Sequence, residues 1–316
     1  MGSTLTIRTP ADFELARDVC SYGYFLLAPN HWDTRRRTLS RTLDVDGLAT
    51  SVTVRQKSAG VLSARFDAAL DRARQSLARA QLSRMLRLDE DEAELAEFHR
   101  VDRRWKKSGR GRLFRSATLF EDVVKTVTSC NVAWPSTIRM NMRLCEVFGK
   151  RSASKAPAFP TEQKLARARP ATLRARCGVG YRDARLVELA KKFMKGEIDE
   201  GWLSDASTAD DEVFAFLKSL PGIGPYAAGN IMMLLGRYSR LALDTESVRH
   251  GKAVLGMEGT EAQLYKQLAA HYEPFGRHKF RSYWFELWDF YESRRGAAEE
   301  WDRETTGRTF TAAQLG

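Results

Sequence analysis

The chain has 316 residues, which is enough for a large core and more typical of two domains than of one. Its composition, with 43% apolar and 10% aromatic residues, excludes a disordered protein. The net charge of +11 favours a polyanionic partner, and nucleic acid is the first candidate.

The sequence carries no signal for a membrane helix, secretion or a metal cluster. No apolar run approaches the roughly 18 residues of a membrane helix, and the N-terminus lacks the apolar segment of a signal peptide. We therefore expect an intracellular protein, in the cytoplasm, nucleoid or nucleus, with no membrane partner. The cysteines lie far apart without metal-ligand spacing, so we expect reduced thiols and no iron–sulfur cluster; they are Cys20, Cys130, Cys145 and Cys177.

Residues 1–88 have the pattern of an antiparallel sheet followed by one helix. Apolar and polar residues alternate around Val52, and Asp46-Gly47 marks a turn. From residue 67 to about 87 the apolar spacing becomes helical. These residues predict a small N-terminal domain.

Two segments concentrate positive charge. Residues 89–112 are acidic and then basic, and we expect them to bridge to a second domain. Between Val101 and Ser116, seven Lys or Arg stand against one Asp, and DTRRRTLSR (33–41) is a second basic cluster. Segregated charge of this kind predicts a basic face.

Residues 113–295 are almost entirely helical in pattern. Thr118 and Glu121 have the spacing of a capping box, and Asp210-Asp211-Glu212 starts a later helix. The last helix, residues 279–295, is unusually aromatic, and we expect residues 296–316 to form a loosely held tail. The predicted fold is mainly α, with an N-terminal antiparallel β-sheet (α+β) domain.

The segment SLPGIGPYAAGN (219–230) predicts a helix–hairpin–helix. Pro221-Gly222 stops the first helix, and Pro225 suits the first position of the second. Gly224 is expected to turn the chain where a Cβ would hinder it. Such a turn presents backbone amides at a helix N-terminus, which bind a phosphate without reading a base. An ordinary corner between two helices is the alternative.

Four segments carry a family resemblance: SYGYFLLAPNHW, LFEDVVKTVTSCNVAWPSTIRMNMRLCEVFG, GVGYRDARLV and LPGIGPYAAGNIMMLLGRYSRLALDTESVR. Together they resemble the helix–hairpin–helix (HhH-GPD) DNA glycosylases over roughly residues 5–295. The branch of 3-methyladenine-DNA glycosylase II and 8-oxoguanine-DNA glycosylase is the most similar. The resemblance implies a helical core behind an N-terminal sheet domain. It also implies base flipping in base excision repair, by a monomer acting on double-stranded DNA with a damaged base.

Asp244 matches the family's catalytic carboxylate, twenty residues after Gly224. Breaking an N-glycosidic bond builds positive charge on the sugar. A fixed carboxylate stabilises that charge and can orient the attacking water. Asp244 also suits the N-cap of a helix starting in DTESV, and the two roles are compatible.

Tyr226 stands where glycosylases that also cut the backbone have a lysine nucleophile. We therefore expect a monofunctional glycosylase without AP-lyase activity. In the branch acting on alkylated bases this position is aromatic, and an electron-rich ring attracts a cationic alkylpurine such as 3-methyladenine. Further base-pocket candidates are Asn230, Trp284 and Trp288, and core packing is the alternative for the aromatic side chains.

The resemblance also indicates DNA contacts. Asn131 and Tyr181 match residues that fill the gap left by the flipped base and wedge the strand. Arg182 matches one that hydrogen-bonds the orphaned base, whereas Ser136 replaces a second reading arginine and argues against strict selection of an opposite cytosine. The alternative for Tyr181 is packing on the core.

The hairpin itself supplies the remaining predicted contacts. Its phosphate-binding residues are Gly222, Ile223 and Gly224. In the family, carbonyls matching those of Lys218, Leu220 and Ile223 hold a Na⁺ or K⁺ ion, and no other cofactor is expected.

Two other functions stay open. An oxidised-purine (8-oxoguanine-like) glycosylase is favoured by Asn131, Tyr181 and Arg182 and opposed by Tyr226 and Ser136. A non-catalytic helix–hairpin–helix DNA-binding module would have no use for a carboxylate near a polyanion.

Overall fold

The computed structural model describes residues 2–305 and divides them into two compact units. Within the described residues, the sheet unit contains the chain up to Asp89, Arg112–Ile198 and residues 298–305. The hairpin unit contains Glu90–Gly111 and Asp199–Ala297. The helical region predicted for residues 113–295 is thus divided between the two units.

Two segments differ from their sequence-based description. The bridge expected at residues 89–112 contains the helices α3 (Glu92–Val101) and η2 (Arg103–Trp105). The chain after residue 296 is not loose where it is described, because Trp301 is 1% exposed and Arg303 donates a 2.7 Å hydrogen bond to the carbonyl of Leu26. The rest of the predicted tail, residues 306–316, lies outside the described part of the chain.

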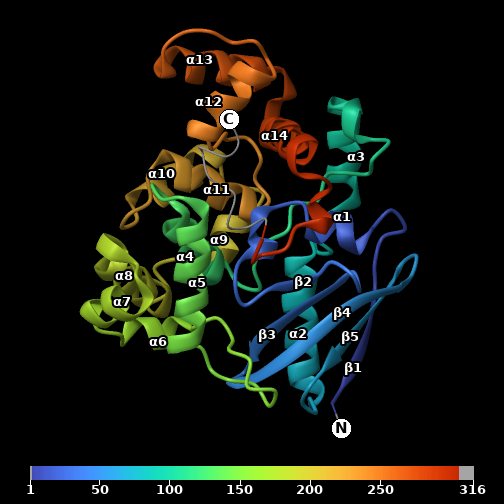
Figure 1. Ribbon diagram of the computed structural model, residues 1–316, viewed down its shortest axis with the longest axis vertical. Coiled ribbons are helices and arrows are strands. Elements are labelled where there is room, and N and C mark those ends of the chain that lie inside the picture. Colours follow the sequence, from blue (N-terminus) through green and yellow to red (C-terminus); the bar gives the residue numbers. More distant parts are fainter. Residues whose placement is uncertain (1, 306–316) are drawn as a thin grey trace. The chain divides into compact units, whose positions relative to one another are not determined.

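The sheet unit is built on a five-stranded sheet in the order β1-β5-β4-β3-β2 (Figure 1). The sheet is antiparallel, as the sequence predicts. The β3–β4 hairpin turns at Asp46-Gly47, where φ is 53° and 72°, the left-handed conformation that two-residue hairpins need. Helix α2 packs against β1 and β3. The strands are β1 (Thr4–Arg8), β2 (His31–Asp33), β3 (Thr38–Val45), β4 (Leu48–Ser58) and β5 (Val61–Phe66).

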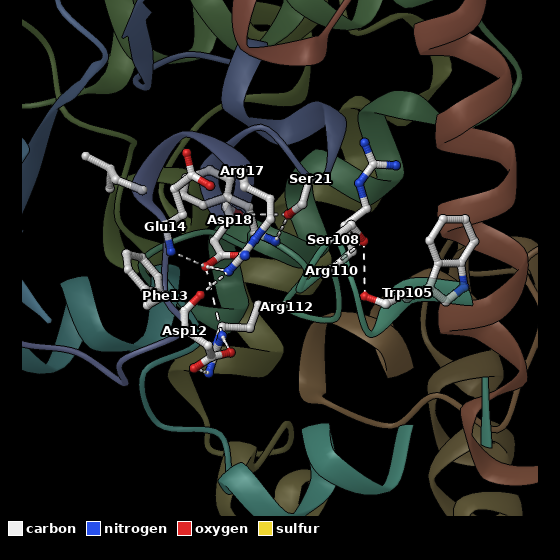
Figure 2. Close-up of polar contacts among 12 residues, drawn as sticks. Asp12, Phe13, Glu14, Arg17, Asp18, Ser21, Trp105, Ser108, Arg110 and Arg112 are labelled. Atoms are coloured by element: carbon white, nitrogen blue, oxygen red, sulfur yellow. Dashed lines mark hydrogen bonds and ion pairs between the residues drawn. The ribbon is translucent and has the colours of Figure 1, made fainter. Parts of the chain in front are cut away.

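Helices form the rest of the sheet unit. They are α1 (Leu15–Val19), α2 (Arg72–Met85), α4 (Leu119–Ser129), α5 (Trp134–Phe148), α6 (Glu162–Ala166), α7 (Pro170–Cys177) and α8 (Asp183–Met194), with the 3₁₀ turns η1 (Gly23–Leu26), η3 (Gly180–Arg182) and η5 (Ala298–Glu300). Figure 2 shows the polar contacts around α1, where Arg17 pairs with Asp18 inside the helix and Arg112 pairs with Asp12 between two loops.

Helix α4 crosses the core of the sheet unit and carries a buried ion cluster. Thr118 accepts the Glu121 backbone N–H at 3.2 Å, which is half of the predicted capping box. The Glu121 carboxylate does not return to Thr118. It pairs with Arg41 at 2.8 Å and Lys125 at 2.7 Å, because two buried cations attract it more strongly than one amide.

The hairpin unit is helical throughout its regular structure. Besides α3 and η2 it contains α9 (Glu200–Ser204), α10 (Asp210–Ser219), α11 (Pro225–Leu235), α12 (Thr245–Ala253), α13 (Glu261–Tyr272), η4 (Glu273–His278) and α14 (Lys279–Arg295). Helix α11 is its centre, since every residue from Ala227 to Leu235 is buried. None of the described helices in either unit is long and apolar enough to cross a bilayer.

Candidate active site

The hairpin between α10 and α11 places a tight turn before the N-terminus of a buried helix (Figure 1). Gly222 has a φ of 78°, so the left-handed conformation that favours glycine falls there. Gly224 has a φ of −90°, and a Cβ built on it meets no atom within 4 Å. The expected hindrance at Gly224 is therefore wrong: the space around this Cα is open, because the residue is exposed.

The same turn orients backbone groups. Ile223 N–H donates to the carbonyl of Leu220 at 3.2 Å, and Ala228 N–H donates to the carbonyl of Gly224 at 2.9 Å. As N-cap, Gly224 offers no side chain to the first amides of α11, so the positive end of the helix dipole faces outward. This end suits a phosphate. A cation on the carbonyls of Lys218, Leu220 and Ile223 stays a prediction.

Asp244 is the N-cap of α12 and forms a capping box with Ser247. Its Oδ1 accepts the N–H of Glu246 at 3.0 Å, the N–H of Ser247 at 3.1 Å and the Ser247 hydroxyl at 3.1 Å. Both predicted roles are compatible with this geometry, because every capping bond ends on one oxygen. The cap therefore fixes the carboxylate through Oδ1.

A hydrogen-bonded chain supports that carboxylate from behind. The Ser247 hydroxyl accepts Asp244 N–H at 2.9 Å and lies 2.6 Å from the Tyr283 hydroxyl. Ser247 and Tyr283 are both buried. Tyr283 therefore donates to Ser247, and Ser247 donates to Asp244, which holds the carboxylate in one orientation.

Tyr226 lies on the first turn of α11, and its hydroxyl is hydrogen-bonded to the Asp244 carboxylate. Burial raises the pKa of Asp244, while hydrogen bonds from Ser247, Glu246 and Tyr226 act in the opposite direction. Burial prevails because all of these donors are neutral. The structure thus brings together Asp244, the predicted catalytic residue, and Tyr226, a predicted base-pocket residue.

A second acid and a tyrosine adjoin this pair. The Tyr291 hydroxyl is 3.5 Å from the Glu246 carboxylate, and Glu246 also pairs with Arg249 at 2.8 Å. Burial raises the pKa of Tyr291 well above its ordinary value, and the charges of Glu246 and Asp244 add to the shift. Tyr291 is therefore a neutral phenol beside two carboxylates.

The aromatic residues of α14 form a stack that reaches this tyrosine. Trp284 and Trp288 lie 5.4 Å apart between ring centroids, and Trp288 meets the edge of Tyr291 at 6.1 Å. Trp288 is 4% exposed and packs in the core, whereas Trp284 is partly exposed. Asn230 is buried on α11 and donates to the carbonyl of Tyr226 at 3.1 Å. These residues support the Asp244 site from inside the unit.

The predicted strand-wedging residues belong to the sheet unit. Asn131 follows α4 with a φ of 51°, a left-handed conformation that asparagine tolerates. Tyr181, in η3, is 52% exposed, which contradicts packing on the core. Arg182 donates to the carbonyls of Val127 and Cys130 and so ties η3 to the end of α4. The structure therefore joins the segments of Asn131 and Tyr181, with Ser136 on the first turn of α5.

The basic segment near residue 110 was predicted to form a basic face, but most of its arginines are paired with carboxylates. Arg104 pairs with Asp102 at 2.8 Å and with Glu286. Arg110 pairs with Asp289 and Glu292 on α14. Arg112 and Arg115 are buried, with partners Asp12 and Asp89. These arginines serve internal ion pairs, and the exposed cations left in the segment are Arg103, Lys106 and Lys107.

The sequence analysis missed Ser247, Tyr283 and Tyr291. The Asp-x-x-Ser spacing from Asp244 was a signal for Ser247, since an N-cap and its third following residue exchange bonds. Tyr283 and Tyr291 are eight residues apart, so they share one face of α14. Nothing local indicates that this face turns toward Asp244.

Comparison with known proteins defines the class of fold. The sequence matches no protein-family model and no curated protein. The structure, however, aligns with solved DNA glycosylases over almost its whole length. The chain therefore has the fold of the helix–hairpin–helix DNA glycosylases, as its sequence motifs predict.

Three solved structures illustrate the likeness. The 3-methyladenine DNA glycosylase from Archaeoglobus fulgidus aligns with a TM-score of 0.70 at 20% identity, covering 92% of this chain and 99% of that one. The 8-oxoguanine glycosylase/lyase of Clostridium acetobutylicum, bound to DNA with cytosine opposite 8-oxoguanine, has a TM-score of 0.66 at 19% identity, covering 94% and 99%. The 3-methyladenine DNA glycosylase of Schizosaccharomyces pombe, bound to abasic DNA, has a TM-score of 0.50 at 20% identity, covering 62% and 96%.

Proposed function

We propose that this chain is a monofunctional DNA glycosylase of base excision repair. It hydrolyses the N-glycosidic bond of a flipped-out damaged base in double-stranded DNA and acts as a monomer. The observation that carries the proposal is the Asp244 carboxylate, which is fixed through Oδ1 and takes its hydrogen bonds from the neutral donors Ser247, Glu246 and Tyr226. Such a carboxylate can stabilise a sugar cation and orient water.

The test is Asp244→Asn in single-turnover excision assays. Losing one preorganised electrostatic group should slow excision by about a hundredfold to a thousandfold. Affinity for the damaged duplex should stay equal or increase, because a negative charge beside DNA is removed. Asp199→Asn is the matched control, since Asp199 is also an N-cap and accepts Gly201 N–H at 2.8 Å. Excision by Asp244→Asn within threefold of the native rate would point to a non-catalytic DNA-binding module.

We propose an alkylated purine, such as 3-methyladenine, as the substrate. Tyr226 offers an electron-rich ring beside Asp244, and a cationic base is attracted to both. The oxidised-purine alternative is favoured by Asn131, Tyr181 and Arg182. The Arg182 guanidinium, however, is buried and donates to backbone carbonyls in this structure. Duplexes that each hold one damaged base, cleaved by alkali after reaction, compare the two substrates directly.

We further propose that no AP-lyase step follows. The Tyr226 phenol cannot form a Schiff base, and the Lys218 ammonium lies 5.4 Å from the Phe214 ring, back along α10. Borohydride should trap no covalent enzyme–DNA adduct, and strand cuts should require alkali. Efficient trapping of the native protein would show that an amine is the nucleophile.

The hairpin should bind a phosphate of the DNA. Gly224→Val fills the open space outside the turn without internal hindrance, so the protein should fold but bind duplex DNA about tenfold more weakly. Ala215→Val, at an exposed position of α10, is the control. Affinity measured at several salt concentrations should fall steeply for the native protein, and an equal affinity of both variants would exclude the hairpin as the contact.

A further inference from the structure

A cleft of about 690 Å³ lies inside the sheet unit. Strands β2, β3 and β4, helix α5 and the loop of residues 151–157 contribute to it. Among its lining residues are His31, Ser40, Thr53, Arg151 and Arg303. Its volume is in the range of sites that bind small molecules.

Strand register gathers hydroxyl groups on one wall of this cleft. His31 is opposite Ser40, and Ser40 is opposite Thr53; Thr42 is opposite Ser51. Directly opposed residues of antiparallel strands share a face, so these side chains form two adjacent rows. The Ser40 and Thr53 hydroxyls are 2.9 Å apart, and those of Thr42 and Ser51 are 3.0 Å apart.

Positive charge outweighs negative charge around the cleft. Its described lining contains three arginines, at positions 41, 151 and 303, and a single carboxylate, Glu146. Arg41 shares the Glu121 carboxylate with Lys125, and its Nε is buried without a hydrogen-bond partner. Arg303 donates to the carbonyls of Leu26 and Asn30 and has no ion pair within residues 2–305.

The loop that forms the opposite wall is held in place. Ser51 is 2.7 Å from the Ser152 hydroxyl and accepts the Ser154 hydroxyl at 2.9 Å. The Ser154 backbone N–H donates to Asp67 at 2.9 Å. The cleft is therefore preformed, which reduces the entropy lost on binding.

The chemistry of the lining favours binding over reaction. Cys145 is buried, and burial with the nearby Glu121 charge raises its pKa to about 12, so the thiol stays protonated and is no nucleophile. The arginines disfavour a metal cation. Guanidinium forks and hydroxyl donors instead match the oxygens of a phosphate group.

We propose that this cleft binds a phosphate ester, at a site separate from Asp244 and independent of the proposed glycosylase reaction. The ester is supplied either by a free mononucleotide or by the backbone of a nucleic-acid strand. Both present the same phosphate oxygens to the arginines and hydroxyls.

Calorimetric titration of the full chain with four probes tests the site: inorganic phosphate, adenosine 5′-monophosphate, adenosine and a short single-stranded oligonucleotide. We expect the monophosphate to bind and adenosine to be inert. Arg151→Gln should weaken the monophosphate about tenfold through loss of a charge-assisted hydrogen bond. Arg303→Gln should do the same. Arg176→Gln, at an exposed position of α7 in the same unit, should change nothing.

The probes also separate the two sources. Tighter binding of the oligonucleotide with a steep salt dependence, weakened by Arg151→Gln and Arg303→Gln, identifies a strand backbone as the ligand of this cleft. Tighter binding of the monophosphate with a shallow salt dependence identifies a free nucleotide. If monophosphate and phosphate bind no better than adenosine, or bind equally well to Arg151→Gln and Arg303→Gln, the proposal is wrong. These titrations involve no base excision, so their outcome is separate from the test of Asp244.

Discussion

The carboxylates of Glu121 in the sheet unit and Asp244 in the hairpin unit are both largely removed from solvent. Their pKa values nevertheless shift in opposite directions. Burial raises the pKa of Glu121, but the charges of Arg41 and Lys125 outweigh burial and hold it at about 2. At Asp244 burial also raises the pKa, and the opposing hydrogen bonds come from neutral donors. Burial therefore prevails only at Asp244.

Under the proposed function, this difference separates a structural acid, Glu121, from a catalytic acid, Asp244. The charge of Glu121 is compensated inside the protein by two cations. The charge of Asp244 is oriented but not neutralised, so it is available to a positive charge that develops on a substrate. Neutral donors give orientation without cancelling the field.

The largest effect should come from Glu121→Gln. This change leaves Arg41 and Lys125 buried without a counter-charge, and we expect a loss of about 3–5 kcal/mol in the free energy of unfolding. Asp244→Asn should leave the free energy of unfolding unchanged within about 1 kcal/mol, because asparagine caps a helix as well as aspartate. Urea denaturation measures both. If Glu121→Gln and Asp244→Asn have the same free energy of unfolding, Glu121 is no more a structural acid than Asp244.

The second largest effect should be a difference between the pH dependence of excision, set by Asp244, and that of stability, set by Glu121. The pKa of Asp244 lies above the ordinary value of about 3.9, so excision should be lost as pH falls through that raised pKa, about tenfold per pH unit below it. The pKa of Glu121 is lowered, so its contribution to stability is complete above about pH 4.3 and is lost as pH falls toward 2. Excision rate and circular dichroism measured over the same pH range show whether activity is lost at a higher pH than the fold. Excision that is lost only together with the fold would contradict it.

The smallest effect should come from Ser247→Ala. Without the Ser247 hydroxyl, Asp244 loses one stabilising hydrogen bond and its link to Tyr283, which we expect to slow excision about tenfold. The pKa of Asp244 should rise further, so the acid limb of the excision profile should move to higher pH. Tyr283→Phe removes only the outer link and is the graded control. A slower enzyme with an unmoved acid limb would indicate a purely structural role for Ser247.

Local sequence patterns predicted elements more successfully than they predicted the use of charged residues. The antiparallel sheet, the turn at Asp46-Gly47 and the aromatic helix 279–295 are confirmed, since each depends on neighbours in the chain. Arg104 and Arg110 were expected on a basic face, but they pair with carboxylates on α14, about 180 residues later. Glu121 likewise turns from its helix cap to Arg41, on a distant strand.

The sequence by itself determined the hairpin, the position of Asp244 after it and the tyrosine at position 226, because turn chemistry and motif spacing are properties of short segments. Only the tertiary structure decided that Tyr226 and Tyr291 lie beside Asp244, that Ser247 links it to Tyr283, and that the hydroxyl rows of the sheet line a cleft with Arg151 and Arg303. Those arrangements depend on which faces of distant helices and strands pack together, and packing is set by the whole core and not by any local period.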